Sequence, residues 1–355
     1  MVEDVVIRTL LFPLSLLYGA AVSVRNALYH LGVLKSVRFS IPVISVGNLT
    51  VGGTGKSPHV EYLLRWLDQY LMVALLSRGY GRKTEGYRSV SVIDTALEVG
   101  DEPLQIKRKF PHIPVSVCES RVLGIPELVR RNPEVQCILL DDAFQHLAVV
   151  PGLNILLTEY SRPFTRDWLL PAGRLRESRS AYRRADLIIV TKCPPELTEE
   201  QRIGLIQEIE PLPRQRIFFS RYHYEEPYDF LRPDVRVPLS GAMDVLLVSA
   251  IAHTDYLMSY LNQQVCSVYA FEFADHHYFS EIDVEDIRKR FEALPSTNKV
   301  LLTTEKDATR LEPYQEYFWK HQLPILVLPV RVVFDRDDEI GFQDEVKRFL
   351  LEFRA

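Results

Sequence analysis

Short, continuous apolar runs alternate with helix-length segments along the first two thirds of the chain. Runs that are apolar without alternation are typical of strands covered by helices on both faces. The pattern therefore predicts a doubly wound α/β domain with a mainly parallel sheet. The seven predicted strands are residues 42–46, 72–76, 113–118, 137–140, 154–157, 187–190 and 217–220.

An amphipathic helix is predicted before the first strand, because apolar residues recur there at steps of three and four. The uncharged stretch 9–24 is slightly too short to span a bilayer. Flanking positive charges suit an anionic membrane surface, although a helix packed against its own domain is the alternative interpretation. The apolar stripe is Leu10, Leu14, Leu17, Ala21, Val24, Leu28 and Leu31, and the flanking residues are Arg8, Arg25, His30, Lys35 and Arg38.

The length of 355 residues exceeds what one hydrophobic core usually organises, which predicts two domains. Residues 222–239 are rich in Pro, Glu, Asp and Arg without periodicity, and are interpreted as a linker. A smaller α/β domain is expected after it, with strands at 245–249, 265–271, 300–303 and 325–332 and helices at 283–293 and 342–353. The predicted units are an N-terminal membrane-associating helix (1–38), a core domain (39–223) and a smaller domain closing over the site (224–355).

A glycine-rich loop connects the first predicted strand to the next helix, at residues 47–57. Glycines let successive N–H groups point at phosphate oxygens, and the following helix adds its positive end. The loop therefore predicts a domain of the P-loop NTPase type that binds a nucleoside triphosphate, although Thr50 stands where the general pattern has glycine. The predicted phosphate-binding residues are Thr50, Val51, Gly52, Gly53, Thr54, Gly55, Lys56 and Ser57.

A predicted strand at 137–140 ends in Asp141 and Asp142. An acidic strand end downstream of a phosphate loop is the arrangement that holds Mg²⁺ on a bound triphosphate, together with the hydroxyl of Ser57. GTP-binding proteins recognise guanine with a carboxylate two residues after a Lys, and here Pro194 follows Lys192 in that place. ATP with Mg²⁺ is therefore the expected cofactor.

Composition narrows the class of protein further. A net charge of −5 gives no global basic field, so nucleic acid is not an expected partner. The four cysteines are far apart and form no C-x-x-C pair, so neither a zinc site nor a disulfide framework is indicated. This distribution of cysteines fits a protein in a reducing, cytosolic compartment.

Seven short motifs, in order, resemble those of the tetraacyldisaccharide 4′-kinase family of the lipid A pathway. The resemblance runs from the N-terminal helix to about Leu311. Two departures are Ser57, where the family more often has Thr, and Ala143, where Gly is usual. The motifs are GNLTVGGTGKSP (47–58), SRGYGR (77–82), GDEP (100–103), DDAFQH (141–146), LPAGRLRE (170–177), DH (275–276) and TEKDA (304–308).

The resemblance implies ATP-dependent phosphorylation of the 4′-hydroxyl of a tetraacylated diglucosamine 1-phosphate. It also implies a peripheral location on the cytoplasmic face of the bacterial inner membrane, and a monomer is expected. By similarity to the family, Asp101 is the candidate base, His276 its partner if the domains close, and Lys56 the cation that follows the transferred phosphate. Asp101 could also be an ordinary loop residue, and His277 adjoins His276.

An acidic substrate also requires positive and polar side chains near the crevice. Glu177 and Gln145 are expected to support Mg²⁺ or its waters, and residues 305–307 form either a hinge network or a helix cap. The candidate substrate-binding residues are Asn48, Arg78, Arg82, Arg121, Gln145, His146, Arg174 and Arg176.

The sequence is also compatible with two other functions. One is a P-loop ATPase or GTPase switch that docks on a membrane without phosphorylating a lipid. The other is a soluble small-molecule kinase whose first helix is only structural. Asp101 distinguishes a kinase from a switch, because a kinase needs a base aimed at a substrate hydroxyl, whereas a switch positions water.

Overall fold

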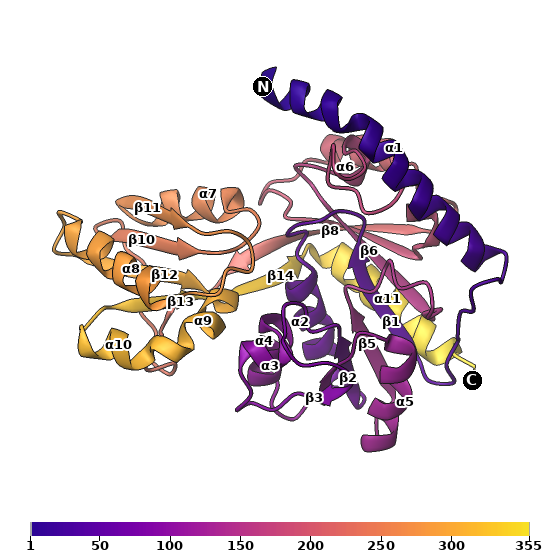
Figure 1. The fold of residues 1–355 in the computed structure, drawn as a ribbon, viewed down its shortest axis with the longest axis horizontal. Coiled ribbons are helices and arrows are strands. Elements are labelled where there is room, and N and C mark those ends of the chain that lie inside the picture. Colours follow the sequence, from indigo (N-terminus) through magenta and orange to yellow (C-terminus); the bar gives the residue numbers. More distant parts are fainter. Residues whose placement is uncertain (1, 355) are drawn as a thin grey trace.

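Two sheets organise the computed structural model, which describes residues 2–354, with side chains from residue 10 onward (Figure 1). The larger sheet has nine strands in the order β14-β8-β7-β6-β1-β5-β2-β4-β3. Its seven central strands pair in parallel, and an antiparallel strand closes each edge. The strands are β1 (Val43–Asn48), β2 (Val73–Ser77), β3 (Arg88–Ser89), β4 (Val115–Val117), β5 (Cys137–Asp141), β6 (Leu153–Glu159), β7 (Leu187–Thr191), β8 (Arg216–Tyr224) and β14 (Val330–Phe334).

Helices cover both faces of this sheet, and a separate apolar cluster fills each interface. Val60, Leu104 and Phe342 lie in the cluster on one face, and Leu128 and Leu205 lie in clusters on the other. This confirms the predicted doubly wound fold. The helices are α2 (Lys56–Leu67), α3 (Ala96–Val99), α4 (Asp101–Lys109), α5 (Arg121–Arg131), α6 (Glu199–Ile209) and α11 (Arg336–Glu352), with 3-10 turns η1 (Phe164–Arg166) and η2 (Arg179–Arg184).

The smaller domain contains a five-stranded sheet in the order β11-β10-β12-β13-β9. Its helices again lie on both faces, and apolar clusters fill both interfaces. The strands are β9 (Tyr228–Asp229), β10 (Asp244–Ser249), β11 (Ser267–Glu272), β12 (Lys299–Thr304) and β13 (Ile325–Leu328), and the helices are α7 (Asp255–Gln264), α8 (Glu281–Ala293), α9 (Glu305–Leu311), η3 (Glu312–Tyr314) and α10 (Gln315–Lys320).

The end of the chain returns to the larger domain, which corrects the assignment of all of 224–355 to the smaller one. The predicted strand 325–332 is two strands, because the chain changes sheets at Pro329, a residue without an N–H to donate to a ladder. β14 then pairs with β8, and Phe342 and Val346 of α11 join the core of the larger domain. The apolar run is continuous in sequence, so hydrophobicity alone does not mark the break.

Two neighbouring segments therefore connect the domains. One runs from β8 to β9 through the predicted linker, and the other runs from β13 to β14 through Pro329. Glu225 N donates to Pro329 O at 3.0 Å, which joins the two segments where they cross. The smaller domain is thus an insertion held at two adjacent points.

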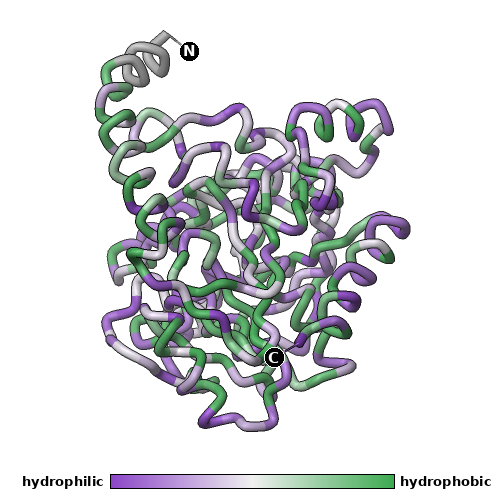
Figure 2. Tube along the Cα trace, turned by 90° about the vertical axis from the view of Figure 1, so that its right-hand side faces the viewer, coloured by the Kyte–Doolittle hydropathy of each residue, from purple (hydrophilic) through white to green (hydrophobic). Residues whose placement is uncertain are grey.

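Helix α1 (Val2–His30) lies along the outside of the larger domain (Figures 1 and 2). Its apolar stripe faces solvent. Leu10 and Leu17 are 73% and 69% exposed, so the interpretation that this stripe packs against its own domain is wrong. The segment Leu10–His30 is long and apolar enough to cross a membrane by length and composition. The opposite face is polar and docks on the domain: Ser15 Oγ donates to Leu169 O at 3.1 Å and accepts from Ala172 N at 3.0 Å.

We expect Phe342→Ala to destabilise the larger domain by about 3–5 kcal/mol, the usual cost of truncating a buried aromatic side chain. Phe342 is 1% exposed and stacks on Phe334 with ring centroids 5.2 Å apart. Urea denaturation measures the loss. Ile340→Ala, at a half-exposed position of the same helix, is the control and should change the free energy of unfolding little. Equal effects of the two variants would contradict this account of α11.

Candidate active site

The glycine-rich loop joins β1 to α2 at the carboxyl edge of the large sheet, as predicted. Gly52 and Gly55 have φ of 100° and 88°, a region that glycine occupies without strain. Asn48 Nδ2 donates to Thr54 Oγ1 at 2.7 Å, and Thr191 Oγ1 donates to Thr54 O at 2.9 Å. These bonds hold the loop open toward the crevice. Asn48 is fully buried and supports the loop, and its predicted contact with substrate stays a prediction.

Asp141 ends β5 in the interior beside the loop. Its Oδ2 accepts from Ser77 Oγ at 3.3 Å, while Oδ1 is buried without a hydrogen-bond partner. Burial, with the neighbouring carboxylates, raises the pKa of Asp141 to about 7. A buried carboxylate oxygen without a donor is a ready ligand for a cation.

Asp142 follows in a left-handed conformation, with φ of 45°, and faces two cations. Arg176 Nη1 donates to both of its oxygens at 3.0 Å, and Lys56 Nζ lies 3.8 Å from Oδ1. Burial opposes ionisation of Asp142, but Lys56 and Arg176 outweigh it and lower the pKa. The predicted pair of acids and the loop lysine are therefore brought together.

Glu177 has a different set of partners from the one expected of a metal ligand. Arg184 donates to both of its carboxylate oxygens, at 2.9 and 3.1 Å, and Asn26 of α1 donates to Oε2 at 2.8 Å. These contacts give Glu177 a structural role, and its role as a metal ligand stays a prediction. Within the described part of the chain, no three His, Cys, Asp or Glu side chains gather as a metal-binding group.

Several cations surround the end of β5. Arg121 is buried, and its Nη2 donates to the main-chain oxygen of Asp141 at 3.0 Å. Burial and the charges of Arg121, Arg25 and Arg78 lower the pKa of His146 to about 4, so its ring is neutral at pH 7. The predicted residues Arg78, Arg121 and His146 thus share one electropositive region.

Two other predicted arginines are engaged in structural contacts. Arg82 pairs with Glu119 and donates to Gly86 O. Arg174 Nε donates to the buried Asp167 at 3.1 Å, and Arg174 also contacts His253 of the smaller domain. Their roles as direct substrate ligands stay predictions.

Sequence reasoning missed the polar face of α1. Arg25 Nη2 donates to Gln145 O at 2.7 Å, and Tyr18 Oη donates to Arg176 O at 2.9 Å. Gln145 in turn donates to Asn48 O at 2.8 Å, so the helix reaches the phosphate loop through one residue. The signal was available, because Ser15, Tyr18 and Asn26 recur at helical spacing opposite the apolar stripe.

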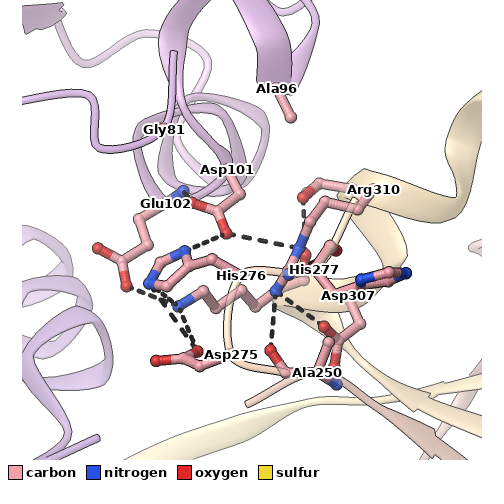
Figure 3. A network of polar contacts seen from close by, with 12 residues as sticks. Gly81, Ala96, Asp101, Glu102, Ala250, Asp275, His276, His277, Asp307 and Arg310 are labelled. Carbon is pink, nitrogen blue, oxygen red and sulfur yellow. Dashed lines mark hydrogen bonds and ion pairs between the residues drawn. The ribbon is translucent and has the colours of Figure 1, made fainter. Parts of the chain in front are cut away.

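Asp101 and His276 meet across the two domains (Figure 3). Asp101 lies in the first turn of α4, and His276 Nδ1 is 3.1 Å from its Oδ2. His276 has φ of 59°, and its N–H donates to Ala250 O at 3.2 Å, which fixes the loop after β11. Burial alone would raise the pKa of Asp101, but the hydrogen bond from His276 and the charges of Lys306 and Arg310 lower it to about 2.

Residues 305–307 lie in the first turn of α9, where they take part in a helix cap and in a contact between the domains. Asp307 N donates to Thr304 Oγ1 at 3.1 Å, which caps α9. Glu305 reaches across to the larger domain, where Lys109 Nζ donates to it and to Glu61, both at 2.6 Å. Burial is the main cause that raises the pKa of Glu305 to about 7. Glu61 belongs to α2, the helix that follows the phosphate loop, so this cluster connects both domains to that helix.

We expect the stability of the wild-type protein to fall, relative to Glu305→Gln, as the pH rises from about 4.5 to about 7. The folded protein holds a proton on Glu305 in this range and the unfolded chain does not, so unfolding becomes more favourable with rising pH. Denaturant midpoints at pH 5 and pH 8 measure the difference. Glu312→Gln removes a more exposed interdomain carboxylate, the partner of Arg108, and is the control. Parallel pH dependence in wild type and Glu305→Gln would contradict the shift.

Comparison with known proteins gives one consistent result. A family model described as tetraacyldisaccharide-1-P 4′-kinase matches residues 7–350. A tetraacyldisaccharide 4′-kinase of Parabacteroides distasonis is 42% identical, covering 96% of this chain and 94% of that protein. The relative from Bacteroides thetaiotaomicron is 39% identical, with 96% and 93% covered. A crystal structure of LpxK from Aquifex aeolicus in complex with ATP aligns with a TM-score of 0.71 at 28% identity, covering 97% and 99% of the two chains.

Proposed function

The chain belongs to the tetraacyldisaccharide-1-P 4′-kinase family, and from this premise we propose which of its residues carry out the transfer. It is an ATP-dependent kinase of lipid A biosynthesis that phosphorylates the 4′-hydroxyl of a tetraacylated disaccharide 1-phosphate. A membrane-docked switch without lipid kinase activity is not favoured by these relatives. The observation that carries our assignment of the site is the contact between Asp101 and His276 across the two domains.

Asp101 acts as the general base in this proposal. The 4′ oxygen forms a bond to the γ-phosphorus, the bond from that phosphorus to the β–γ bridging oxygen breaks, and ADP leaves. The hydroxyl proton passes to Asp101, whose Oδ2 is held by His276 while Oδ1 accepts only the N–H of Glu102 at 2.9 Å. His276 orients the carboxylate and is supplied by the smaller domain, so the base is positioned when the domains meet.

Lys56 stabilises the charge that develops on the transferred phosphoryl group. The ligands we assign to Mg²⁺ are Ser57 at the start of α2 and the carboxylates of Asp141 and Asp142. The unpartnered Oδ1 of Asp141 supports this donor set. These residues would hold the ion, which when bound would neutralise negative charge on the triphosphate.

The electropositive region at the end of β5 suits an anionic group of the substrate. Arg25, Arg78 and Arg121 contribute charge there, and the neutral ring of His146 adds a hydrogen-bonding group. We assign the 1-phosphate of the disaccharide to this region. Arg25 comes from α1, so the same helix would contact the headgroup and the acyl chains.

We propose that α1 lies on the cytoplasmic face of the inner membrane, where ATP is present, with its apolar stripe toward the acyl chains. Phe12 is in edge contact with Trp168, which is half exposed, so an aromatic pair extends the apolar surface from α1 onto the larger domain. Aromatic and leucine side chains on one face of a helix favour such an interfacial position. One chain contains every group assigned to the site, which supports a monomer.

We expect Asp101→Asn and His276→Ala each to lower kcat by about 10²–10⁴-fold while ATP affinity changes little. The double variant should lose less than the product of the two single losses, because residues that act as a unit are non-additive. Steady-state kinetics on detergent-dispersed lipid and titration with an ATP analogue measure the two quantities.

His277→Ala is the matched control for this experiment, because His277 adjoins His276 but pairs with Asp283 on its own domain. It should retain most of the activity. Fully multiplicative losses for Asp101 and His276 would argue against a dyad. Near-normal activity of Asp101→Asn would remove the proposed base.

Replacing Leu14 and Leu17 together by Asp should leave ATP affinity unchanged and reduce turnover on dispersed lipid. Both side chains are more than half exposed, so their replacement removes apolar contact with acyl chains and not core packing. The control is the double replacement by Asp of Ile282 and Leu351, which are more exposed than Leu14 and Leu17 and lie far from α1 in sequence. Binding to anionic vesicles, followed by sedimentation, gives a second readout. Unchanged turnover and vesicle binding would refute the membrane role.

A further inference from the structure

Lys306 lies where the two domains meet. It is the second residue of α9 in the smaller domain, and its side chain is 19% exposed. Nζ lies 3.2 Å from His276 Nε2 and 3.1 Å from Glu102 Oε1 of the larger domain. Asp275 Oδ1 is 3.9 Å away. One ammonium group therefore contacts the residue beside Asp101, the residue beside His276, and His276 itself.

The hydrogen-bonding chemistry of these groups determines the tautomer of His276. An ammonium group has three N–H donors and no acceptor. His276 Nε2 must therefore accept from Lys306, which leaves the ring proton on Nδ1, and Nδ1–H donates to Asp101 Oδ2. The imidazole is thus a donor toward Asp101.

Lys306 also compensates negative charge at the contact between the domains. Closure brings three carboxylates together, those of Asp101, Glu102 and Asp275, and burying like charges opposes the contact. Arg310 compensates part of this charge, with its Nε 3.5 Å from Asp101 Oδ2.

Arg310 is also bonded within its own domain. Its Nη2 donates to Asp307 Oδ1 at 2.8 Å, and its Nη1 donates to His277 O at 2.9 Å. Lys306 instead pairs directly with a carboxylate of the other domain. Two aromatic residues complete the surroundings: the Tyr80 ring lies 4.9 Å from that of His276, and Tyr278 donates to Gly81 O at 3.4 Å.

We propose that Lys306 is a positioning residue of this kinase: it fixes the Nδ1–H tautomer of His276 and neutralises Glu102 and Asp275, so that the domains close with Asp101 presented as the base. This inference rests on the proposed role of Asp101. In this proposal Lys306 does not contact the reacting atoms. It acts through His276 and through the contact between the domains.

The experiment compares Lys306→Met and Lys306→Arg with wild type. Lys306→Met keeps the length of the side chain but removes the donor and the charge. We expect kcat on dispersed lipid to fall at least about tenfold with little change in ATP affinity, since tautomer and alignment affect the proton transfer and not nucleotide binding. Lys306→Arg retains both the donor and the charge and should restore most of the loss. Lys289→Met, which removes an exposed lysine of α8 in the same domain, is the control.

Two further readouts separate positioning from a general structural effect. Long-range ¹⁵N–¹H NMR of the histidine rings should show His276 protonated at Nδ1 in wild type and in Lys306→Arg, with the tautomer lost or mixed in Lys306→Met. The signal is assigned with a His276→Asn variant. The acid limb of the pH profile of kcat should also move to higher pH in Lys306→Met, because the charge of Lys306 contributes to the lowered pKa of Asp101. If Lys306→Met does not fold, Lys306→Gln with the same readouts replaces it.

The outcomes distinguish this proposal from the one on which it rests. Activity retained by Asp101→Asn would overturn the proposed base. If Asp101→Asn is inactive while Lys306→Met keeps the wild-type kcat, tautomer and pH profile, the base stands and the role of Lys306 is overturned. A loss in Lys306→Met that Lys306→Arg restores, with the tautomer following it, supports the proposal.

Discussion

The need to pair charges where the two domains meet governs the site more than any other constraint. An unpaired charge in a poorly hydrated interface costs several kcal/mol, so each buried group there requires a partner from the opposite side. Helix α4 carries Asp101 at its first turn and Lys109 at its last residue, and each pairs with a residue of the smaller domain. The base is therefore held by the same set of contacts that holds the domains together. Any motion that separates them exposes these charges to water, where their pairing is worth far less.

Features that are confined to one strand or one loop were largely predictable from the sequence. Each strand expected in the first domain is found within a few residues, because short apolar runs bounded by polar loops leave few alternatives. The phosphate loop, the acidic end of β5 and the pairing of Asp101 with His276 were also located correctly, the last through family resemblance.

Features that depend on the three-dimensional path of the chain were not predictable from the sequence. Hydrophobicity continues through Pro329 from one sheet into the other, and although a proline can interrupt a strand, it does not say which sheet the next strand joins, so the position of α11 could not be predicted. Asn48, Glu177 and Arg174 are polar residues beside the site whose side chains turn toward supporting contacts, and a sequence gives no direction for a side chain in a loop. The inward face of α1 was overlooked because the outward stripe explained the helix by itself.

The two adjacent crossings between the domains also bear on evolution and engineering. Because the chain leaves and re-enters the larger domain at neighbouring points, joined by the bond from Glu225 to Pro329, the ends of the insertion are already close in space. Removing residues between them would leave the larger sheet with all nine strands and only a short gap to bridge. The larger sheet is therefore complete without the inserted domain, whereas the contact at Asp101 depends on His276 from that domain.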